Sequence, residues 1–267
     1  MRYENPLHLA SEAANADLLS GGRLQLGISR GSPEKAVDGQ ATFGYYLEDG
    51  QTWNDVARDR AAEFRRAISG DPVAHSQRAL DFGRGPDLVI EPQSPGLSER
   101  IWWGAGSIPT GVWAGKQGMS LLSSTLLLQD DGRPFHVQQA DQARQYRAAL
   151  AEHHPEVAAA RSGGLVAVTR SAFPLVSDVD RRYFGHDRDS SDGVGWLEGG
   201  SARSGPTHVG EPDQIAEMFA ADEAMVEADY VLFALPSQLG VAVCVHILES
   251  FTKYVAPELG WKPNWEQ

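Results

Sequence analysis

The sequence predicts an α/β fold built on a parallel sheet. Residues 5–31 read as a capped helix, a Gly-Gly stop and a short apolar strand. Helical and strand patterns keep alternating along the chain, which favours one parallel sheet over separate helical and sheet domains. A length of 267 residues, 42% of them hydrophobic and 22% charged, is enough for one large core. We therefore expect a single domain over residues 1–267.

Local patterns define the elements of the first half. Asn5 and Pro6 form an N-cap and first turn for a helix that ends at Gly21-Gly22, and a strand follows over residues 24–28. The next expected elements are a helix over 54–69, a Gly/Pro-rich excursion over 70–100 with a hairpin around 80–82 and 88–90, a strand over 101–103, and a helix over 109–117.

The second half continues the alternation. The expected elements are a strand over 121–127, an amphipathic helix over 138–154, a strand over 165–168, a helix from 211 to 227, a strand over 230–234 and an apolar helix over 240–255. Residues 187–206 are polar and rich in Gly and Ser, a composition that cannot pack a core. We expect a mobile loop there.

Charge and composition exclude several partners. A formal net charge of -13 disfavours a nucleic-acid or anionic-membrane surface, because phosphates would be repelled over most of the exterior. No stretch is long and apolar enough to cross a bilayer, and nothing resembles a signal peptide, so we expect a cytoplasmic protein. The histidines lack the spacing of a metal site, and no metal is expected.

The segment Gly27-Ile28-Ser29-Arg30-Gly31 matches the G-x-S-x-G pattern of serine hydrolases. A strand precedes it, as that pattern requires. However, Ser32-Pro33 and a Gly-rich segment follow, whereas a nucleophile elbow needs a helix that starts at the serine. A hydrolase using Ser29 is therefore only a minor alternative.

A second motif follows the strand over 101–103. Gly104, Gly106 and Ser107 begin like a dinucleotide fingerprint, but Pro109 replaces the third glycine. What remains is a serine N-cap with Thr110 in the first helical turn. Free N–H groups and the positive end of the helix dipole favour a phosphate there, although ordinary capping also explains the serine.

The two motifs complement each other. In a parallel barrel, the strand ends that carry Ser29-Arg30 and Gly106-Ser107 face the same rim. Arg30 would then supply the positive charge that a dianionic phosphate held by Ser107 and Thr110 requires.

Three blocks of sequence together resemble a known family. They are YENPLHLASEAANADLLSGGRLQLGISRG, IWWGAGSIPTGVWAGKQGMSLLSSTLL, and VGEPDQIAEMF before a Tyr-Val-Leu-Phe strand. In this order they resemble the luciferase-like flavin-dependent monooxygenases and oxidoreductases. The resemblance implies a TIM-type (β/α)8 barrel that binds FMN or, in one branch, a deazaflavin coenzyme.

The resemblance also assigns roles to residues. Arg30 is similar to the family's phosphate-binding arginine after the fourth strand, and Ser29 beside it lies near the flavin ring. Gly106, Ser107 and Thr110 resemble the phosphate-binding turn after the fifth strand. The mobile loop expected over residues 187–206 falls where the family carries a lid, so the resemblance implies a lid there. A further family signature, Asp17, Ser20, Gly22 and Arg23, we interpret as structural, because it joins a helix to a strand at the barrel's opposite end.

The resemblance starts at the helix before the family's fourth strand. Five barrel strands can be placed, so we expect an incomplete barrel that lacks the first three strands, a deficit of about 80 to 90 residues. In the family those strands supply one wall of the flavin pocket and the usual catalytic histidine. The catalytic residues therefore stay unknown.

Two functions remain open. The resemblance implies an enzyme, at least in a complete barrel, that uses reduced flavin to oxidise a small organic substrate, with NAD(P)H or a separate flavin reductase as electron source. The alternative is a non-catalytic flavin-binding protein or partner subunit. Since an incomplete barrel exposes sheet edges, we also expect a homodimer or a partner chain.

Overall fold

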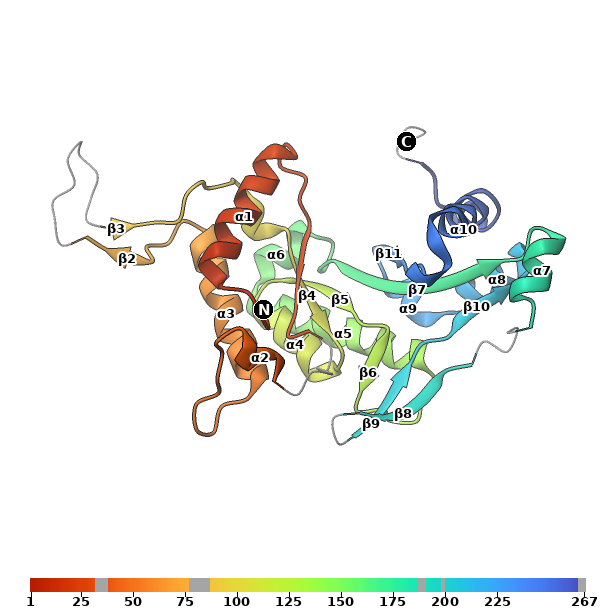
Figure 1. Ribbon diagram of the computed structural model, residues 1–267, viewed down its shortest axis with the longest axis horizontal. Coiled ribbons are helices and arrows are strands. Elements are labelled where there is room, and N and C mark those ends of the chain that lie inside the picture. The colour runs from red at the N-terminus through yellow and green to blue at the C-terminus, as the bar shows by residue number, and fades with distance from the viewer. Residues whose placement is uncertain (32–37, 77–86, 187–190, 198–199, 264–267) are drawn as a thin grey trace. The chain divides into compact units, whose positions relative to one another are not determined.

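The computed structural model describes residues 1–31, 38–76, 87–186, 191–197 and 200–263 (Figure 1). The chain divides into two compact units, residues 1–104 and 105–267. The single domain expected from the sequence stays a prediction. Within the described residues, no helix is long and apolar enough to span a membrane.

The first unit alternates helices and short strands. Its elements are α1 (Pro6–Leu19), β1 (Leu26–Ile28), α2 (Gly39–Thr42), α3 (Trp53–Ile68), β2 (Ala74–His75), β3 (Asp87–Leu88), the 3-10 helix η2 (Leu97–Glu99) and β4 (Ile101–Ala105), whose last residue belongs to the second unit. The expected strand and helix over residues 24–28 and 54–69 are confirmed. β1 and β4 pair in parallel, with Leu26 opposite Ile101.

The start of α1 agrees with the predicted cap, since the Asn5 side chain accepts hydrogen bonds from the N–H groups of Leu7 and His8. β2 and β3 pair antiparallel as a short hairpin. The segment 80–82, which the sequence predicted as part of a hairpin, lies outside the described residues. The hairpin's register was not predictable from so few residues.

Asp17 ties α1 to the rest of the first unit. Its buried carboxylate accepts hydrogen bonds from the Leu24 N–H at 2.9 Å, Ser94 Oγ at 2.7 Å and Arg100 Nη2 at 2.5 Å. Burial raises the pKa of Asp17, but these bonds outweigh it and hold that pKa below its ordinary value. The structural role assigned to Asp17 from the sequence is therefore confirmed.

The second unit begins with α4 (Ile108–Lys116) and ends with a 3-10 turn. Its elements are α4, β5 (Ser120–Ser123), β6 (Leu126–Leu128), α5 (Phe135–His153), α6 (Pro155–Ala160), β7 (Val166–Pro174), α7 (Asp178–Phe184), β8 (Gly193–Leu197), β9 (Gly200–Ser204), β10 (Thr207–Gly210), α8 (Pro212–Ala220), α9 (Glu223–Glu227), β11 (Tyr230–Phe233), η3 (Ser237–Leu239), α10 (Gly240–Tyr254) and η4 (Ala256–Leu259).

β7 is the central strand of this unit (Figure 1). It runs six residues beyond the predicted end at 168, to Pro174. The reason is its pairing: β7 pairs in parallel with β5 and β11 along its first part and with β10 along its last four residues. The sequence pattern contained no signal for β10. Helices α8 and α10 pack on β7, and Ala172, Ile215, Phe219 and Val255 form a buried cluster between them.

Two predicted elements are interrupted. The strand expected over 121–127 is two strands, β5 and β6, and the helix expected up to 227 breaks between α8 and α9. At this second break the Asp222 side chain accepts hydrogen bonds from the N–H groups of Ala224 and Met225, so it caps a new helix.

The polar segment 187–206 is only in part a loop. β8 and β9 pair antiparallel, and β9 pairs antiparallel with β6, which makes a three-stranded sheet. The loop prediction is therefore wrong for residues 193–197 and 200–204, because backbone pairing to β6 stabilises a segment with few apolar side chains. Residues 187–190 and 198–199 lie outside the described residues, and the lid role stays a prediction.

Helices α4 and α5 approach closely at a glycine. A Cβ built on Gly115 would lie 2.5 Å from the Tyr146 carbonyl oxygen and 3.0 Å from the Leu150 N–H nitrogen, both backbone atoms of α5. Tyr146 is buried beside this contact and donates its hydroxyl to the Met119 carbonyl at 3.0 Å. The helices can hold this distance only without a side chain at residue 115.

We predict that Gly115→Ala lowers the free energy of unfolding by about 1 to 3 kcal/mol, the usual cost of overpacking a well-packed site. Urea unfolding followed by circular dichroism measures the change. Gly195→Ala is the matched control, because a Cβ at Gly195 has nothing within 4 Å. Equal stability of the two variants would contradict the close contact.

Candidate functional site

The turn between β4 and α4 is built as the sequence predicted. Ser107 has extended backbone angles and caps α4, and its Oγ lies 2.9 Å from Thr110 Oγ1 and 3.4 Å from the Thr110 nitrogen. Pro109 has no N–H, and the Gly111 N–H donates to the Ser107 carbonyl at 3.0 Å. The Ile108 N–H belongs to the first helical turn, where no intrahelical acceptor exists.

A hollow of about 50 Å³ lies beside this turn. Its lining comes from the start of α4, from β6 and the loop after it, and from α5: Ser107, Ile108, Leu127, Leu128, Gln129, Asp131 and Gln138. Gln129 has a positive φ of 67°, which few residues other than glycine adopt. The helix N-terminus therefore faces an open space and not a packed neighbour.

Gly106 brings the turn close to β6. The Leu128 N–H donates to the Gly106 carbonyl at 2.7 Å, and a Cβ at Gly106 would lie 3.2 Å from the Leu126 carbonyl oxygen. A glycine here thus keeps the turn tight against the strand that lines the hollow.

A buried polar network lies behind the turn. Gln142 Nε2 donates to the Ser107 carbonyl at 2.7 Å and to the Ala105 carbonyl at 3.4 Å, and its Oε1 accepts from Ser123 Oγ at 2.6 Å. Gln139 Nε2 donates to Ser123 Oγ at 2.9 Å and to the Ser124 carbonyl at 2.8 Å. Sequence analysis missed these glutamines, because on an amphipathic helix they look like exposed polar positions.

In the first unit, Ser29 and Arg30 follow β1 and are half-buried. Ser29 Oγ accepts a hydrogen bond from the Gly31 N–H at 2.9 Å, and a Cβ at Gly104 would lie 3.0 Å from Ser29 Cβ. A hollow of about 460 Å³ opens at this strand end; its lining residues are Met1, Arg2, Tyr3, Glu4, Leu9, Leu26, Gly27, Ile28, Ser29 and Gly31.

The serine-hydrolase alternative does not fit this strand end. A nucleophile elbow starts a helix at the serine. Residues 29–31 are not helical, so the segment lacks the geometry that the G-x-S-x-G pattern requires.

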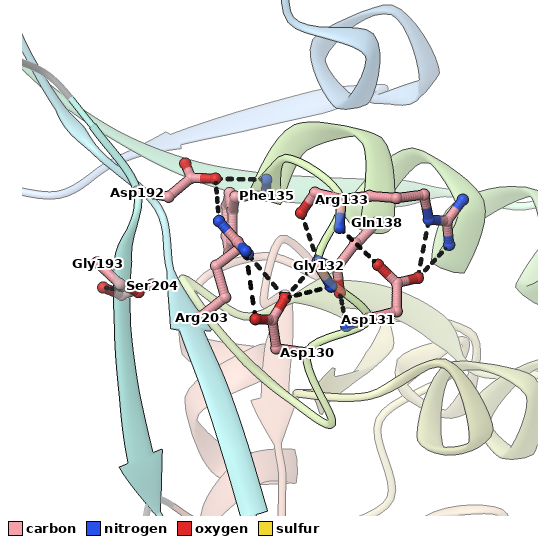
Figure 2. A network of polar contacts seen from close by, with 10 residues as sticks. All are labelled: Asp130, Asp131, Gly132, Arg133, Phe135, Gln138, Asp192, Gly193, Arg203 and Ser204. Carbon is pink, nitrogen blue, oxygen red and sulfur yellow. Dashed lines mark hydrogen bonds and ion pairs between the residues drawn. The ribbon is translucent and has the colours of Figure 1, made fainter.

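A charged network connects the β8–β9 hairpin to the loop that lines the smaller hollow (Figure 2). Arg203 of β9 binds Asp130 at 2.7 Å and Asp192 at 3.0 Å, and Asp192 also accepts from the Phe135 N–H at 2.8 Å. Gln138 Nε2 donates to Asp130 at 2.7 Å. The bonds from Arg203 and Gln138 outweigh burial and hold the pKa of Asp130 far below its ordinary 3.8.

The second unit also contains a buried histidine. His208 of β10 is 7% exposed and meets the Phe219 ring edge-on at 4.8 Å. Within the described part of the chain, neither of its ring nitrogens has a hydrogen-bond partner. Burial, and then the positive charge of Arg170, lower the pKa of His208 from 6.5 to about 4. Arg170 itself is buried in an ion pair with Asp222 at 2.7 Å.

The predicted residues thus divide between the two units. Gly106, Ser107 and Thr110 form one turn beside a hollow, and Ser29 and Arg30 follow a strand of the other unit. Among the described residues, no group of three or more His, Cys, Asp or Glu side chains could hold a metal ion.

Comparison with known proteins identifies the family. The sequence profile of the luciferase-like monooxygenases matches residues 2–232, which is most of the chain. No curated protein gives a match.

Solved structures with the same fold include several flavin or deazaflavin enzymes. The monooxygenase RslO1 from Streptomyces bottropensis has a TM-score of 0.60 at 14% identity, over 97% of this chain and 75% of its own. The oxygenating constituent of 3,6-diketocamphane monooxygenase from Pseudomonas putida was solved with FMN. Its TM-score is 0.60 at 18% identity, over 96% of this chain and 76% of its own.

A third neighbour is the coenzyme F420-dependent tetrahydromethanopterin reductase from Methanopyrus kandleri. Its TM-score is 0.54 at 15% identity, over 95% of this chain and 79% of its own. Identities this low show the fold alone. The α/β fold of the luciferase-like barrel family is therefore confirmed.

The buried His208 predicts a specific loss of stability in mild acid. A histidine with a folded pKa near 4 stays neutral while the unfolded chain takes up a proton near pH 6.5. The free energy of unfolding should therefore fall as the pH drops from about 6.5 to about 4. His208 alone accounts for up to about 3 kcal/mol of this loss. His208→Phe removes this contribution and keeps an apolar ring against Phe219.

Urea unfolding of both proteins between pH 4 and pH 8 measures the difference. Other groups titrate equally in the two proteins, so the difference in unfolding free energy isolates His208. A difference that does not change with pH would contradict the buried, neutral state of this ring.

Proposed function

Because the chain belongs to the luciferase-like monooxygenase family, we propose that it is a flavin-dependent oxidoreductase or monooxygenase acting on a small organic substrate. The observation that carries the proposal is the hollow at the N-terminus of α4, which Ser107 and Ile108 line. A helix N-terminus with free N–H groups and a capping hydroxyl suits the terminal phosphate of a flavin nucleotide.

In this proposal, five residues bind the cofactor. Ser107 and Thr110 donate their hydroxyls to the phosphate, Gly106 lets the turn approach it, and the family resemblance assigns Arg30 and the adjacent Ser29 to the same cofactor. An arginine suits this task because its guanidinium binds phosphate through paired hydrogen bonds. In a chain with a net charge of -13, a phosphate needs such a local positive charge.

FMN is the proposed cofactor, and a deazaflavin coenzyme is the alternative. The 3,6-diketocamphane monooxygenase neighbour is described in complex with FMN, whereas the reductase neighbour depends on coenzyme F420. Both cofactors have a phosphate on a ribityl chain, so the phosphate turn serves either.

When bound, the reduced flavin would supply the reducing electrons for the reaction, and NAD(P)H or a separate reductase would regenerate it. The protein's own contribution is to anchor the phosphate, to orient the ring and to keep water away from it. We propose a homodimer as the functional assembly.

A second candidate function is a non-catalytic flavin-binding subunit. The specific observation is an apolar surface on β11 and α10, where Val231 is 41%, Leu232 46% and Val241 81% exposed. A surface of this kind is typical of a protein interface. Turnover of NAD(P)H and simple aldehydes by the flavin-loaded protein favours the enzyme, and tight flavin binding without turnover favours the subunit.

We predict that Arg30→Ala weakens FMN binding by about 1.5 to 3 kcal/mol, the range for hydrogen bonds to charged groups. Riboflavin lacks the phosphate, so its affinity should not change. Quenching of flavin fluorescence measures both affinities. The matched control is Arg66→Ala, which removes an exposed arginine from α3 of the same unit. If the Arg30 variant binds FMN as tightly as the wild type, the phosphate lies elsewhere.

A further inference from the structure

We infer that Gln142 of α5 is a positioning residue for the phosphate turn, and that it aims the turn's N–H groups at the phosphate by holding the carbonyl groups behind them. The inference rests on the proposed function. Its basis is the pair of hydrogen bonds from Gln142 Nε2, at 2.7 Å to the Ser107 carbonyl and at 3.4 Å to the Ala105 carbonyl.

Peptide geometry makes these bonds informative. In a trans peptide unit the C=O and the following N–H point in opposite directions. Since the Ser107 carbonyl points at Gln142, the Ile108 N–H points away from Gln142, and Ile108 lines the hollow. The Ala105 carbonyl and the Gly106 N–H are related in the same way. The Ser107 carbonyl also accepts from the Gly111 N–H and the Ala105 carbonyl from the Ser124 N–H, both at 3.0 Å. Gln142 adds a side-chain anchor to each carbonyl and so helps to fix the direction of two N–H groups without reaching the ligand.

The Ile108 N–H is the critical donor of this turn. Pro109 contributes none, the Thr110 N–H is directed at Ser107 Oγ, and the Gly111 N–H donates to the Ser107 carbonyl. A rotation of the Ser107–Ile108 peptide would remove the one backbone donor of the first turn that is left for a phosphate.

Gln142 is itself held in one orientation. Its Oε1 accepts the proton of Ser123 Oγ, and that hydroxyl in turn accepts from Gln139 Nε2. Ser123 and both glutamines are 0% exposed, so no water competes with these bonds. The donors run in one direction, from Gln139 through Ser123 and Gln142 to the turn, an arrangement in which each bond polarises the next.

Core stability alone does not explain this network. Gln139 Oε1 is buried and, among the described residues, has no hydrogen-bond partner, which costs free energy. Gln142 also packs tightly on α4, since a Cβ at Gly111 would lie 2.9 Å from Gln142 Cγ. The network thus keeps the Gln142 amide against the turn's carbonyls although it leaves one buried oxygen unsatisfied, which points to a task at the turn.

The test compares FMN with riboflavin, which differ only by the phosphate. Gln142→Met keeps the length of the side chain and removes both donors. We expect the ratio of FMN affinity to riboflavin affinity to fall about tenfold, while riboflavin affinity stays within about twofold of wild type. The matched control is Gln145→Met, an exposed glutamine one turn away on α5 whose side chain donates to Asp141.

Ser123→Ala is the second variant, in case Gln142→Met does not fold. It removes the hydroxyl that orients Gln142 and should lower the same ratio by a smaller factor, again without changing riboflavin affinity. A wild-type ratio in a folded variant, or an equal loss of both affinities, would overturn the inference. If the wild-type protein itself does not prefer FMN over riboflavin, the proposed phosphate site is wrong, whatever the Gln142 and Ser123 variants show.

Discussion

The geometry of the candidate site depends on the hydrogen bonds between α5 and the backbone carbonyls that flank Gly106. The bond from Gln142 Nε2 to the Ser107 carbonyl is 2.7 Å long, and the Gln142 side chain is fully buried. This bond is costly to break, because the buried amide would lose a hydrogen-bond acceptor that no water can replace. The direction of the first N–H of α4, and with it the proposed phosphate site, follows from this constraint.

Close helix packing makes that bond attainable. Gly111 and Gly115 leave no side chain between α4 and α5, so the α5 backbone and the Gln142 stem approach α4 directly. The charged network of Arg203, Asp130 and Asp192 then holds the β8–β9 hairpin beside the same loop (Figure 2). The start of α4, β6 with the loop after it, and α5 thus line the small hollow.

Much of this arrangement could be predicted from short patterns. The caps at Asn5 and Ser107 depend on residues within three positions, so sequence sufficed for them. The β8–β9 hairpin, β10 and the Gln142 network depend on partners far along the chain. A Gly/Ser-rich segment gives no signal that β6 will pair with it, and a glutamine's burial depends on the fold around it.

The most direct test of the account is the amide signal of Ile108 in a nitrogen-edited NMR spectrum during titration with FMN and with riboflavin. We expect FMN, but not riboflavin, to shift this proton downfield, because a phosphate oxygen accepts its hydrogen bond. The Thr110 amide should move less. A protein that binds FMN while the Ile108 signal stays in place, or moves equally with riboflavin, would contradict a phosphate site at the start of α4.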